Sequence, residues 1–290
     1  MTTSHELVVV TGASSGMGRA TAVALARRGF HVLAGVRSAE AGDDIREPGL
    51  EPVLLDVTRP EDVAALAGRV ARDPEQRPLR ALVNCAGMAA NGPVEALPLS
   101  TWRAMFEVNL FGQIALIQAL LPALRRSGGR IVNISSTGGR IAMAAFGAYS
   151  ATKFALEAVS DALRREVHDQ GVEVTVIEPG AVRTGMTDSG TRAAHALTAT
   201  MSDDQRIRYD RLMTTFHATV REFERTGMSA DAAGAEIADV VTAPRARSRR
   251  TIGRDAALFT RLARLLPDGV LDWALASSGR RAVVRSARAE

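Results

Sequence analysis

The hydrophobic positions of this chain follow two patterns in turn, one typical of strands and the other of helices. Residues 7–10 and 31–36 are short, almost wholly apolar runs, which is typical of parallel strands buried on both faces. Longer amphipathic stretches separate such runs. Further strands are expected at 51–56, 79–83, 130–134 and 172–177, and helices at 60–72, 101–126, 149–170 and 229–241. This alternation predicts an α/β fold with one doubly wound parallel sheet of about seven strands.

Two stretches have a less regular pattern. The expected helix 101–126 is apolar around most of its circumference, so we expect the sheet to cover one side and a partner subunit the other. Asn109 lies inside this apolar run, and because an unpaired buried amide is costly, it should have a specific partner. Residues 185–225 are mixed and carry long Met and aromatic side chains. They are expected either to cover an apolar substrate cleft or to form helix core, with equal weight.

Composition narrows the class of protein. The chain has 290 residues and is 46% hydrophobic, enough for a sizeable core. No signal peptide and no apolar run long enough to span a bilayer is expected. The single cysteine, Cys85, excludes an internal disulfide framework and favours a reducing, cytoplasmic location. The five histidines have no ligand-like spacing, so no metal site is expected.

The charge is unevenly distributed. The formal net charge is +4, but residues 244–290 alone carry eleven arginines against four acidic residues. Because the excess is confined to this tail, it is a poor argument for nucleic-acid binding. The short basic stretch 244–250 is expected to be a solvated loop.

A glycine-rich turn follows the first strand directly. Residues 11–18 read Thr-Gly-Ala-Ser-Ser-Gly-Met-Gly and lead into a helix-like stretch. At such a turn the backbone N–H groups of a helix N-terminus face an anion, and glycines allow the pyrophosphate of a dinucleotide to approach. A turn without a ligand is the alternative. The expected cofactor contacts here are Gly12, Ser14, Ser15, Gly16, Met17 and Gly18.

The end of the second strand indicates which dinucleotide is bound. An acidic residue there would bind the ribose 2′-OH of NAD, but Val36 is followed by Arg37, which suits a 2′-phosphate. NADP(H) is therefore the expected cofactor, and NAD(H) is the weaker alternative. Arg37 could also be an ordinary solvated surface arginine that contacts no cofactor. Asp56 ends the third expected strand, where its carboxylate could receive the adenine amino group, and Val57 directly after it is a further expected cofactor contact.

Ser136, Tyr149 and Lys153 are the candidate chemical groups. Tyr149 and Lys153 are four residues apart, so on a helix their side chains share one face. A phenol has a pKa near ~10, and an adjacent ammonium would lower it toward a useful range. Lys153 is the only lysine among 36 basic residues. Taken alone, the spacing also fits an ordinary lysine beside a core tyrosine.

Residues 6–255 resemble a short-chain dehydrogenase/reductase, in particular the NADP-preferring steroid and retinol dehydrogenase-like members. The resemblance lies in the glycine turn 11–18, Asn84-Cys-Ala-Gly87, Asn109, Ser136, Tyr149 with Lys153, and Pro179-Gly180 with Thr184. The resemblance implies that Tyr149 is the general acid/base and that Ser136 orients the substrate oxygen. It also implies that Lys153 lowers the tyrosine pKa and holds the nicotinamide ribose, and that Asn109 supports a proton-relaying water. Cys85 occupies a position at which members of this family usually have Asn. The further cofactor contacts implied are Asn84, Ala86, Gly87, Pro179, Gly180, Val182 and Thr184.

The resemblance also implies a function. It is the NADP(H)-dependent interconversion of a carbonyl and a primary or secondary alcohol on an apolar, bulky substrate. Two alternatives are a reductase of carrier-bound 3-oxoacyl thioesters and an NADP(H)-binding regulator without turnover. A homodimer or homotetramer through helices 101–126 and 149–170 is expected.

Residues 1–255 would form one Rossmann-fold domain, in which 185–228 cover the substrate. Residues 256–290 would be a helical extension of it, resembling that of steroid- and retinol-type members. Apolar tail residues could cover the cleft, pack on a subunit or touch an anionic membrane, but packing on the chain's own body is favoured. These tail residues are Leu258, Phe259, Leu262, Leu265 and Leu266.

Overall fold

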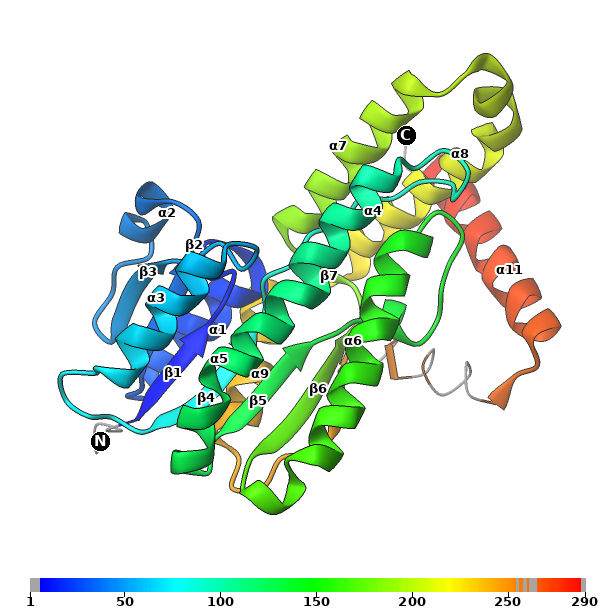
Figure 1. Ribbon diagram of the computed structural model, residues 1–290. Helices are drawn as coiled ribbons and strands as arrows, with labels where there is room; N and C mark the ends of the chain where they lie inside the picture. The colour runs from blue at the N-terminus through cyan, green and yellow to red at the C-terminus, as the bar shows by residue number, and fades with distance from the viewer. Residues whose placement is uncertain (1–5, 254–255, 258–259, 261–264, 288–290) are drawn as a thin grey trace.

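A parallel seven-stranded sheet forms the centre of the molecule (Figure 1). The computed structural model describes residues 6–253, 256–257, 260 and 265–287. The strand order is β3-β2-β1-β4-β5-β6-β9, and every neighbouring pair is parallel. The predicted doubly wound α/β fold is therefore confirmed. The strands are β1 (Leu7–Val10), β2 (His31–Val36), β3 (Leu50–Leu54), β4 (Leu79–Asn84), β5 (Arg130–Ile134), β6 (Glu173–Pro179) and β9 (Arg249–Ile252).

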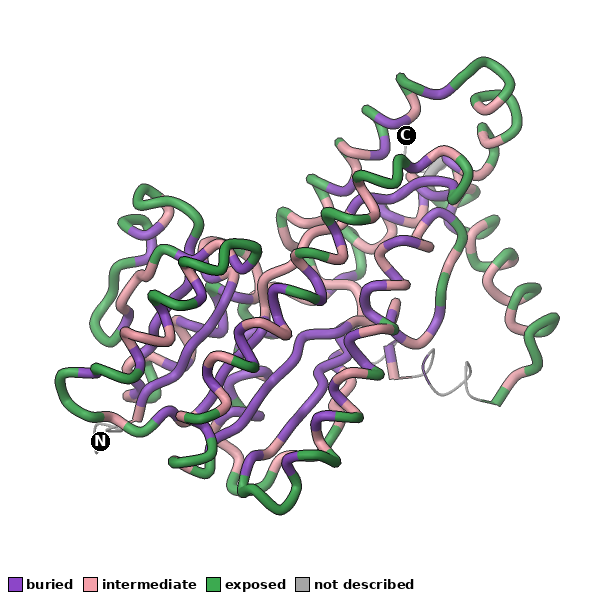
Figure 2. The backbone as a smooth tube through the Cα atoms, in the orientation of Figure 1, coloured by how far each residue is buried: buried purple, intermediate pink, exposed green. Residues whose placement is uncertain are grey.

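Helices cover both faces of the sheet. On one face α1 (Gly16–Arg27) and α9 (Ala230–Thr242) pack together, and their buried residues join the core beneath them. On the other face lie α3 (Pro60–Ala71), α5 (Gly112–Ser127) and α6 (Gly147–Glu166). A short helix, α2 (Ala39–Asp43), follows β2. Figure 2 shows the central strands buried along most of their length, which is why the sequence of β1 is wholly apolar and that of β2 is almost so.

The long helix expected at 101–126 is divided into three parts. It consists of α4 (Leu99–Phe106), a π-helical segment η1 (Glu107–Phe111) and α5. The stretch Leu99–Ser127 is long and apolar enough to cross a membrane by length and composition, contrary to the sequence-based expectation. In the fold it is a core helix, because Leu116, Leu120 and Leu124 are fully buried against the sheet and its neighbours.

Residues 185–225 form two helices beyond the carboxyl ends of the strands (Figure 1). These are α7 (Gly185–Thr200) and α8 (Asp203–Thr226), and the short pair β7 (Val182–Arg183) and β8 (Met228–Ser229) lies at their base. Leu197 and Met201 pack in a cluster that reaches Tyr149, whereas Met213 and Phe216 belong to a separate cluster. The long apolar side chains therefore serve both as helix core and as the surroundings of Tyr149.

The C-terminal part begins differently from the prediction. Arg250 and its two successors, expected to open the tail, belong to β9, and Ile252 is fully buried. The expected solvated loop 244–250 therefore ends in a strand of the sheet. Helix α11 (Asp268–Ala287) packs along α8, where Arg285 forms an ion pair of 2.8 Å with Glu222. Leu258, Phe259 and Leu262 lie outside the described residues, and Leu265 is exposed.

Candidate active site

The glycine-rich turn between β1 and α1 forms a close-fitting cradle. Gly12 and Gly16 have φ angles of +64° and +56°, a region that strongly favours glycine. A Cβ on Gly12 would lie 2.8 Å from the Cα of Ala86, and one on Gly18 would lie 2.2 Å from the Gly12 carbonyl oxygen. Ser15 makes no side-chain capping bond at the start of α1, so the first-turn N–H groups stay available for an anion. These residues fit the pyrophosphate of a dinucleotide.

Thr11 fastens this cradle to the next strand, a role that the sequence did not predict. Its Oγ1 accepts hydrogen bonds from the backbone N–H groups of Cys85 (3.0 Å) and Ala86 (2.8 Å). The only sign of this role in the sequence was a polar residue directly after a buried strand. These two hydrogen bonds fix the turn 11–18 against the segment 84–87.

The expected specificity residues lie at the ends of β2 and β3. Arg37 is exposed directly after β2. Oδ1 of Asp56 accepts hydrogen bonds from the Thr58 hydroxyl (2.7 Å) and backbone N–H (2.9 Å). These bonds, with a smaller contribution from Arg37, lower the pKa of the Asp56 carboxyl. Arg37 and Asp56 thus follow two paired strands, in which Val36 lies opposite Leu54, and Val57 is buried.

The segment 84–87, at the end of β4, is held by a hydrogen bond to the neighbouring strand β5. Asn84 is fully buried, and its Nδ2 donates to Oδ1 of Asn133 on β5 (2.9 Å). Burial raises the pKa of the Cys85 thiol to about 12, so the side chain is a protonated thiol at neutral pH. A Cβ on Gly87 would lie 3.4 Å from Oδ1 of Asn109 and 3.5 Å from Cε of Met186.

Asn109 lies in η1 and has the specific partners that its burial required. Its Oδ1 accepts from the Met88 N–H (2.8 Å), and its Nδ2 donates to the Met88 carbonyl (2.9 Å) and to Oγ1 of Thr152 (3.1 Å). The prediction of a specific partner is confirmed, although the sequence did not identify Met88 or Thr152. The π-helical segment is thereby joined to the loop after β4 and to α6. Such segments recur at functional sites.

Ser136, Tyr149 and Lys153 come together at the end of β5. Ser136 begins a short 3₁₀ turn, η2 (Thr137–Gly139), and its Oγ accepts from the Gly138 N–H (3.0 Å). A Cβ on Gly138 would lie 3.4 Å from both the Ser136 Oγ and the Tyr149 Cε1, so the two side chains meet there. Lys153 Nζ donates to the Ile134 carbonyl (2.8 Å) and lies 5.7 Å from the centre of the Tyr149 ring.

The acidity of the tyrosine differs from the expectation. Burial raises the pKa of Tyr149 to about 12, although a hydrogen bond with Ser136 acts in the opposite direction. The sequence predicted a lowered pKa; the reason for the difference is that desolvation dominates while the Lys153 ammonium is directed at a backbone carbonyl. Burial lowers the pKa of Lys153 to about 8. At neutral pH Tyr149 is therefore protonated and Lys153 is mostly charged.

The segment after β6 closes the site. The Gly180 N–H donates to the Ile252 carbonyl (2.9 Å), and Pro179 ends β6. Val182 lies in β7, and the Thr184 side chain is 3.2 Å from the position of a Cβ on Gly16, so this segment lies over the glycine turn. The predicted residues surround the carboxyl edge of the sheet where strand order reverses between β1 and β4, the usual ligand position in such sheets. Among the described residues, no three His, Cys, Asp or Glu side chains could hold a metal ion.

Relatives in sequence agree with this geometry. The family model described as short chain dehydrogenase matches residues 6–195. Bovine 17-beta-hydroxysteroid dehydrogenase type 6 is 43% identical over 188 residues, which cover 63% of this chain and 59% of that protein. Human retinol dehydrogenase 5 is 34% identical over 286 residues, covering 94% of this chain and 89% of that one.

Solved structures agree as well. A short-chain dehydrogenase from Streptomyces avermitilis has a TM-score of 0.74 at 33% identity and covers 97% of both chains. A Burkholderia cenocepacia short chain dehydrogenase in complex with NADP has a TM-score of 0.72 at 25% identity, covering 93% of this chain and 98% of that one. A Burkholderia phymatum structure in complex with NAD (TM-score 0.74, 22% identity, covering 90% and 94% of the two chains) shows the shared fold. The cradle, the Ser136–Tyr149–Lys153 set and the match over residues 6–195 lead to one conclusion: this chain belongs to the short-chain dehydrogenase/reductase family.

Proposed function

We propose that this oxidoreductase interconverts a carbonyl and an alcohol on an apolar, bulky substrate with NADP(H). The observation that carries the proposal is the meeting of the Ser136 and Tyr149 side chains at Gly138, on the edge of the sheet that also holds the glycine cradle. The chain's single lysine lies one helical turn from Tyr149.

NADP(H), when bound, supplies or accepts the hydride. Residues 11–18 would hold its pyrophosphate, Arg37 its 2′-phosphate and Lys153 its nicotinamide ribose. During reduction, negative charge develops on the carbonyl oxygen. Tyr149, protonated at neutral pH because its pKa is about 12, donates a proton to that oxygen while Ser136 donates a hydrogen bond.

The surroundings of Tyr149 support an apolar substrate. Tyr149 packs in a cluster of Met, Leu, Ala and Trp side chains contributed by α4, α6, α7 and the loop after β4. Relatives of this chain are named for steroids and for retinol. We therefore favour lipophilic ketones, aldehydes and alcohols of this size as substrates, and a carrier-bound acyl thioester as the second choice.

The function is tested by NADPH and NADH oxidation against apolar ketones and aldehydes, with steroids, retinal and a 3-oxoacyl thioester included. Turnover of lipophilic carbonyls, faster with NADPH, is the expected result. Preference for the thioester would move the assignment to the second choice. Tight NADPH binding with no turnover of any carbonyl would favour a regulator and contradict the proposal.

Arg37→Ala should weaken NADPH binding without weakening NADH binding. Loss of one charge-assisted contact to a 2′-phosphate is expected to raise the Kd for NADPH about tenfold to a hundredfold. Calorimetric titration of both cofactors measures the change. The matched control is Arg46→Ala, another exposed arginine of the same region, which pairs with Asp43 (2.9 Å). Equal losses for the two cofactors would contradict the assignment of Arg37.

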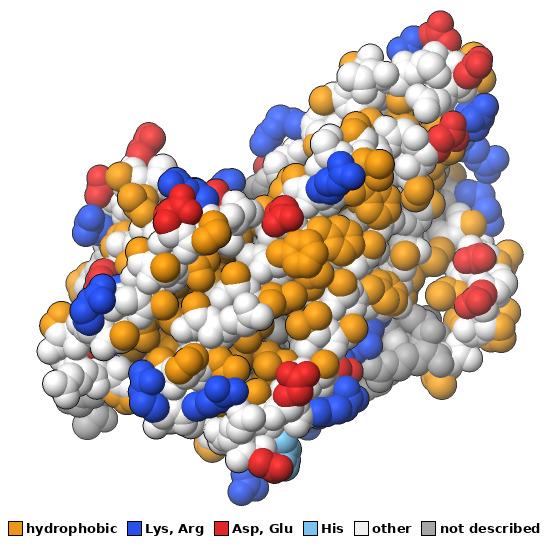
Figure 3. Space-filling model, in the orientation of Figure 1, with side chains coloured by type: hydrophobic (Ala, Val, Ile, Leu, Met, Phe, Trp, Pro, Cys, Tyr) orange, Lys and Arg blue, Asp and Glu red, His pale blue; other side chains and the backbone are white. Residues whose placement is uncertain are grey.

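We further propose that the chain self-associates through the helical face formed by η1, α5 and α6. Figure 3 shows hydrophobic side chains gathered across this side of the molecule. Phe111 at the end of η1 and Phe154 on α6 are 51% and 44% exposed, which is unusual for large aromatic residues. A second copy covering this face would bury about 800 Å² on each partner if the dimer is of ordinary size.

Phe111→Glu combined with Phe154→Glu should therefore halve the mass of the particle in solution, because two charges would be placed in an apolar interface. Light scattering after size-exclusion chromatography measures the mass. Ile207→Glu is the control, since Ile207 is 79% exposed but lies on α8. An unchanged mass in the double variant would exclude this face as the interface.

A further inference from the structure

A network of buried charges lies directly behind the catalytic set. Glu157, on α6, and Glu178, on β6, are 4% and 3% exposed. Arg140 Nε donates to Oε1 of Glu178 (2.7 Å), and its Nη2 lies 3.1 Å from Oε2 of Glu157. Arg249 Nη2 donates to Oε2 of Glu157 (3.0 Å) and lies 2.9 Å from Oδ2 of Asp161. Arg140, Glu157, Glu178 and Arg249 are called the charged network below.

Each member comes from a segment that carries part of the proposed site. Arg140 lies in the connection from Ser136 to Tyr149, and Glu157 lies one turn beyond Lys153 on α6. Glu178 immediately precedes Pro179 and Gly180. Arg249 belongs to β9 and adds the C-terminal strand. Because separating a pair would leave the buried carboxylate of Glu157 or Glu178 without its arginine partner, which is costly, these ion pairs restrict how the four segments can move relative to one another.

Close packing at Gly139 adds a second restriction. A Cβ there would lie 2.6 Å from the Ser135 Oγ, 3.1 Å from the Lys153 carbonyl oxygen and 3.2 Å from the Glu157 Cγ. The turn that follows Ser136 therefore rests directly on α6, between Lys153 and Glu157. Ser136 and the helix that carries Tyr149 are joined here both by packing and by charge.

We propose that the charged network is the positioning device of the reaction: it sets Ser136 against Tyr149 and holds the Glu157 carboxylate one helical turn from Lys153. The inference rests on the proposed function. Lys153 is faced by Tyr149 and Glu157 from α6, by Cys85 from the end of β4, and by the Ile134 carbonyl from β5.

Among the groups that face Lys153, Glu157 is the carboxyl group, and its ion pairs with Arg140 and Arg249 favour its ionised form. Burial lowers the pKa of Lys153 to about 8, and Glu157 and Cys85 act in the opposite direction. The Cys85 thiol stays protonated because its own pKa is about 12. Glu157 is itself faced by Arg140, Arg249, Glu178 and Ser135, and its arginine partners oppose the rise in pKa that burial causes.

The single lysine makes a direct test possible. Protein labelled with ¹³C,¹⁵N-lysine gives one set of lysine side-chain NMR signals, so the titration of Lys153 is read without assignment and without substrate. The midpoint is expected near pH 8 in the unaltered chain. In Glu157→Gln it should fall by about one pH unit, because a negative charge that favours the ammonium is removed.

Asp73→Asn is the matched control. Asp73 is another buried carboxylate held by two arginines, Arg69 (2.9 Å) and Arg77 (2.7 Å). It precedes β4, at the amino ends of the strands, whereas the proposed site lies at their carboxyl ends. This variant should leave the Lys153 midpoint unchanged. If the midpoints of Glu157→Gln and Asp73→Asn shift equally, the proposal is wrong.

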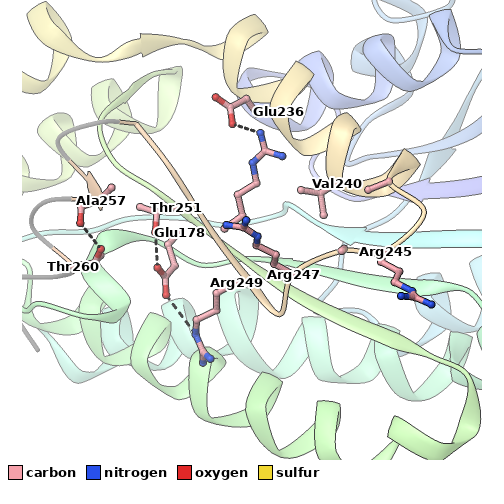
Figure 4. A pocket seen from close by; sticks show the side chains of 12 residues that line it. Glu178, Glu236, Val240, Arg245, Arg247, Arg249, Thr251, Ala257 and Thr260 are labelled. Carbon is pink, nitrogen blue, oxygen red and sulfur yellow. Dashed lines mark hydrogen bonds and ion pairs between the residues drawn. The ribbon is translucent and has the colours of Figure 1, made fainter.

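A cavity next to the charged network allows a second test. Its volume is about 740 Å³, and it is lined by Arg249, Glu178 and Thr251 among others (Figure 4). Arg249→Ala should lower kcat about tenfold with little change in KM, since positioning is lost rather than binding. Free guanidinium, well below denaturing concentrations, should enter through the cavity and restore part of this loss. Tyr149→Phe should not be rescued.

The outcomes separate the inference from the proposed function. Turnover by the unaltered protein, together with an unshifted midpoint in Glu157→Gln and no guanidinium rescue of Arg249→Ala, would overturn the positioning role and leave the function intact. A shifted midpoint in a protein that turns over no carbonyl would overturn the function, and only the electrostatic effect of Glu157 on Lys153 would then stand.

Discussion

Tyr149→Phe is expected to lower kcat for carbonyl reduction by about 10²–10⁴-fold, the usual contribution of a positioned general acid. The substitution removes only the hydroxyl, while the ring keeps its packing against the buried cluster that includes Met105 and Leu197. The Kd for NADPH should therefore change little. Steady-state kinetics and cofactor titration on the same preparation measure both quantities.

The other tyrosine of the chain provides the control. Tyr209 lies on α8, where its hydroxyl donates to the carboxylate of Glu95 (2.6 Å) at the protein surface. Tyr209→Phe also removes one hydroxyl from one ring and should retain nearly full activity. Near-normal turnover in Tyr149→Phe would remove Tyr149 from its role as the acid.

Gly18→Ala should severely weaken cofactor binding. The added Cβ would lie 2.2 Å from the Gly12 carbonyl oxygen, which belongs to the backbone and cannot rotate away. The turn must shift away from α1, at a cost of about 1–3 kcal/mol, equivalent to about tenfold to a hundredfold in affinity if the strain is released in the cofactor-free state. The same strain should lower the melting temperature. Calorimetric titration with NADPH and thermal unfolding measure the two effects.

Gly269→Ala adds the same methyl group at the start of α11, where no atom lies within 4 Å of the new Cβ. It should leave the affinity unchanged and should not lower the melting temperature, because alanine favours a helix more than glycine does. Unweakened NADPH binding in Gly18→Ala would mean that the cofactor does not depend on this turn.

The sheet was predictable because its strands are buried on both faces. Val8, Val32 and Val132 belong to almost continuous apolar runs, and such runs identify parallel strands directly. β9 was missed for a related reason: three of its four residues, Arg249, Arg250 and Thr251, are polar. Arginines in a sequence usually indicate solvent-exposed positions. Here Arg249 pairs with Glu157 and Asp161, and Arg250 pairs with Glu236, partners that the local sequence does not reveal.

The site was predictable as far as its motifs are local. The glycine turn, Ser136, Tyr149 and Lys153 are recognised by residue type and spacing, and the structure brings them to one edge. The hydrogen bonds of Thr11 and Asn109, and the ion pairs of Glu157, join positions far apart along the chain. The raised pKa of Tyr149 also depends on burial, which spacing does not reveal.

The π-helical segment η1 places one residue more in this helix than a regular α-helix would hold. A π-helix closes its hydrogen bonds over one residue more than an α-helix does, so residues 107–111 act as an insertion within one long helix. Deleting one of them would let this stretch close as regular α-helix, so that α4 and α5 would keep their faces, but the turn that carries Asn109 would change. A single deletion here should therefore disturb the hydrogen bonds of Asn109 more than the packing of the flanking helices.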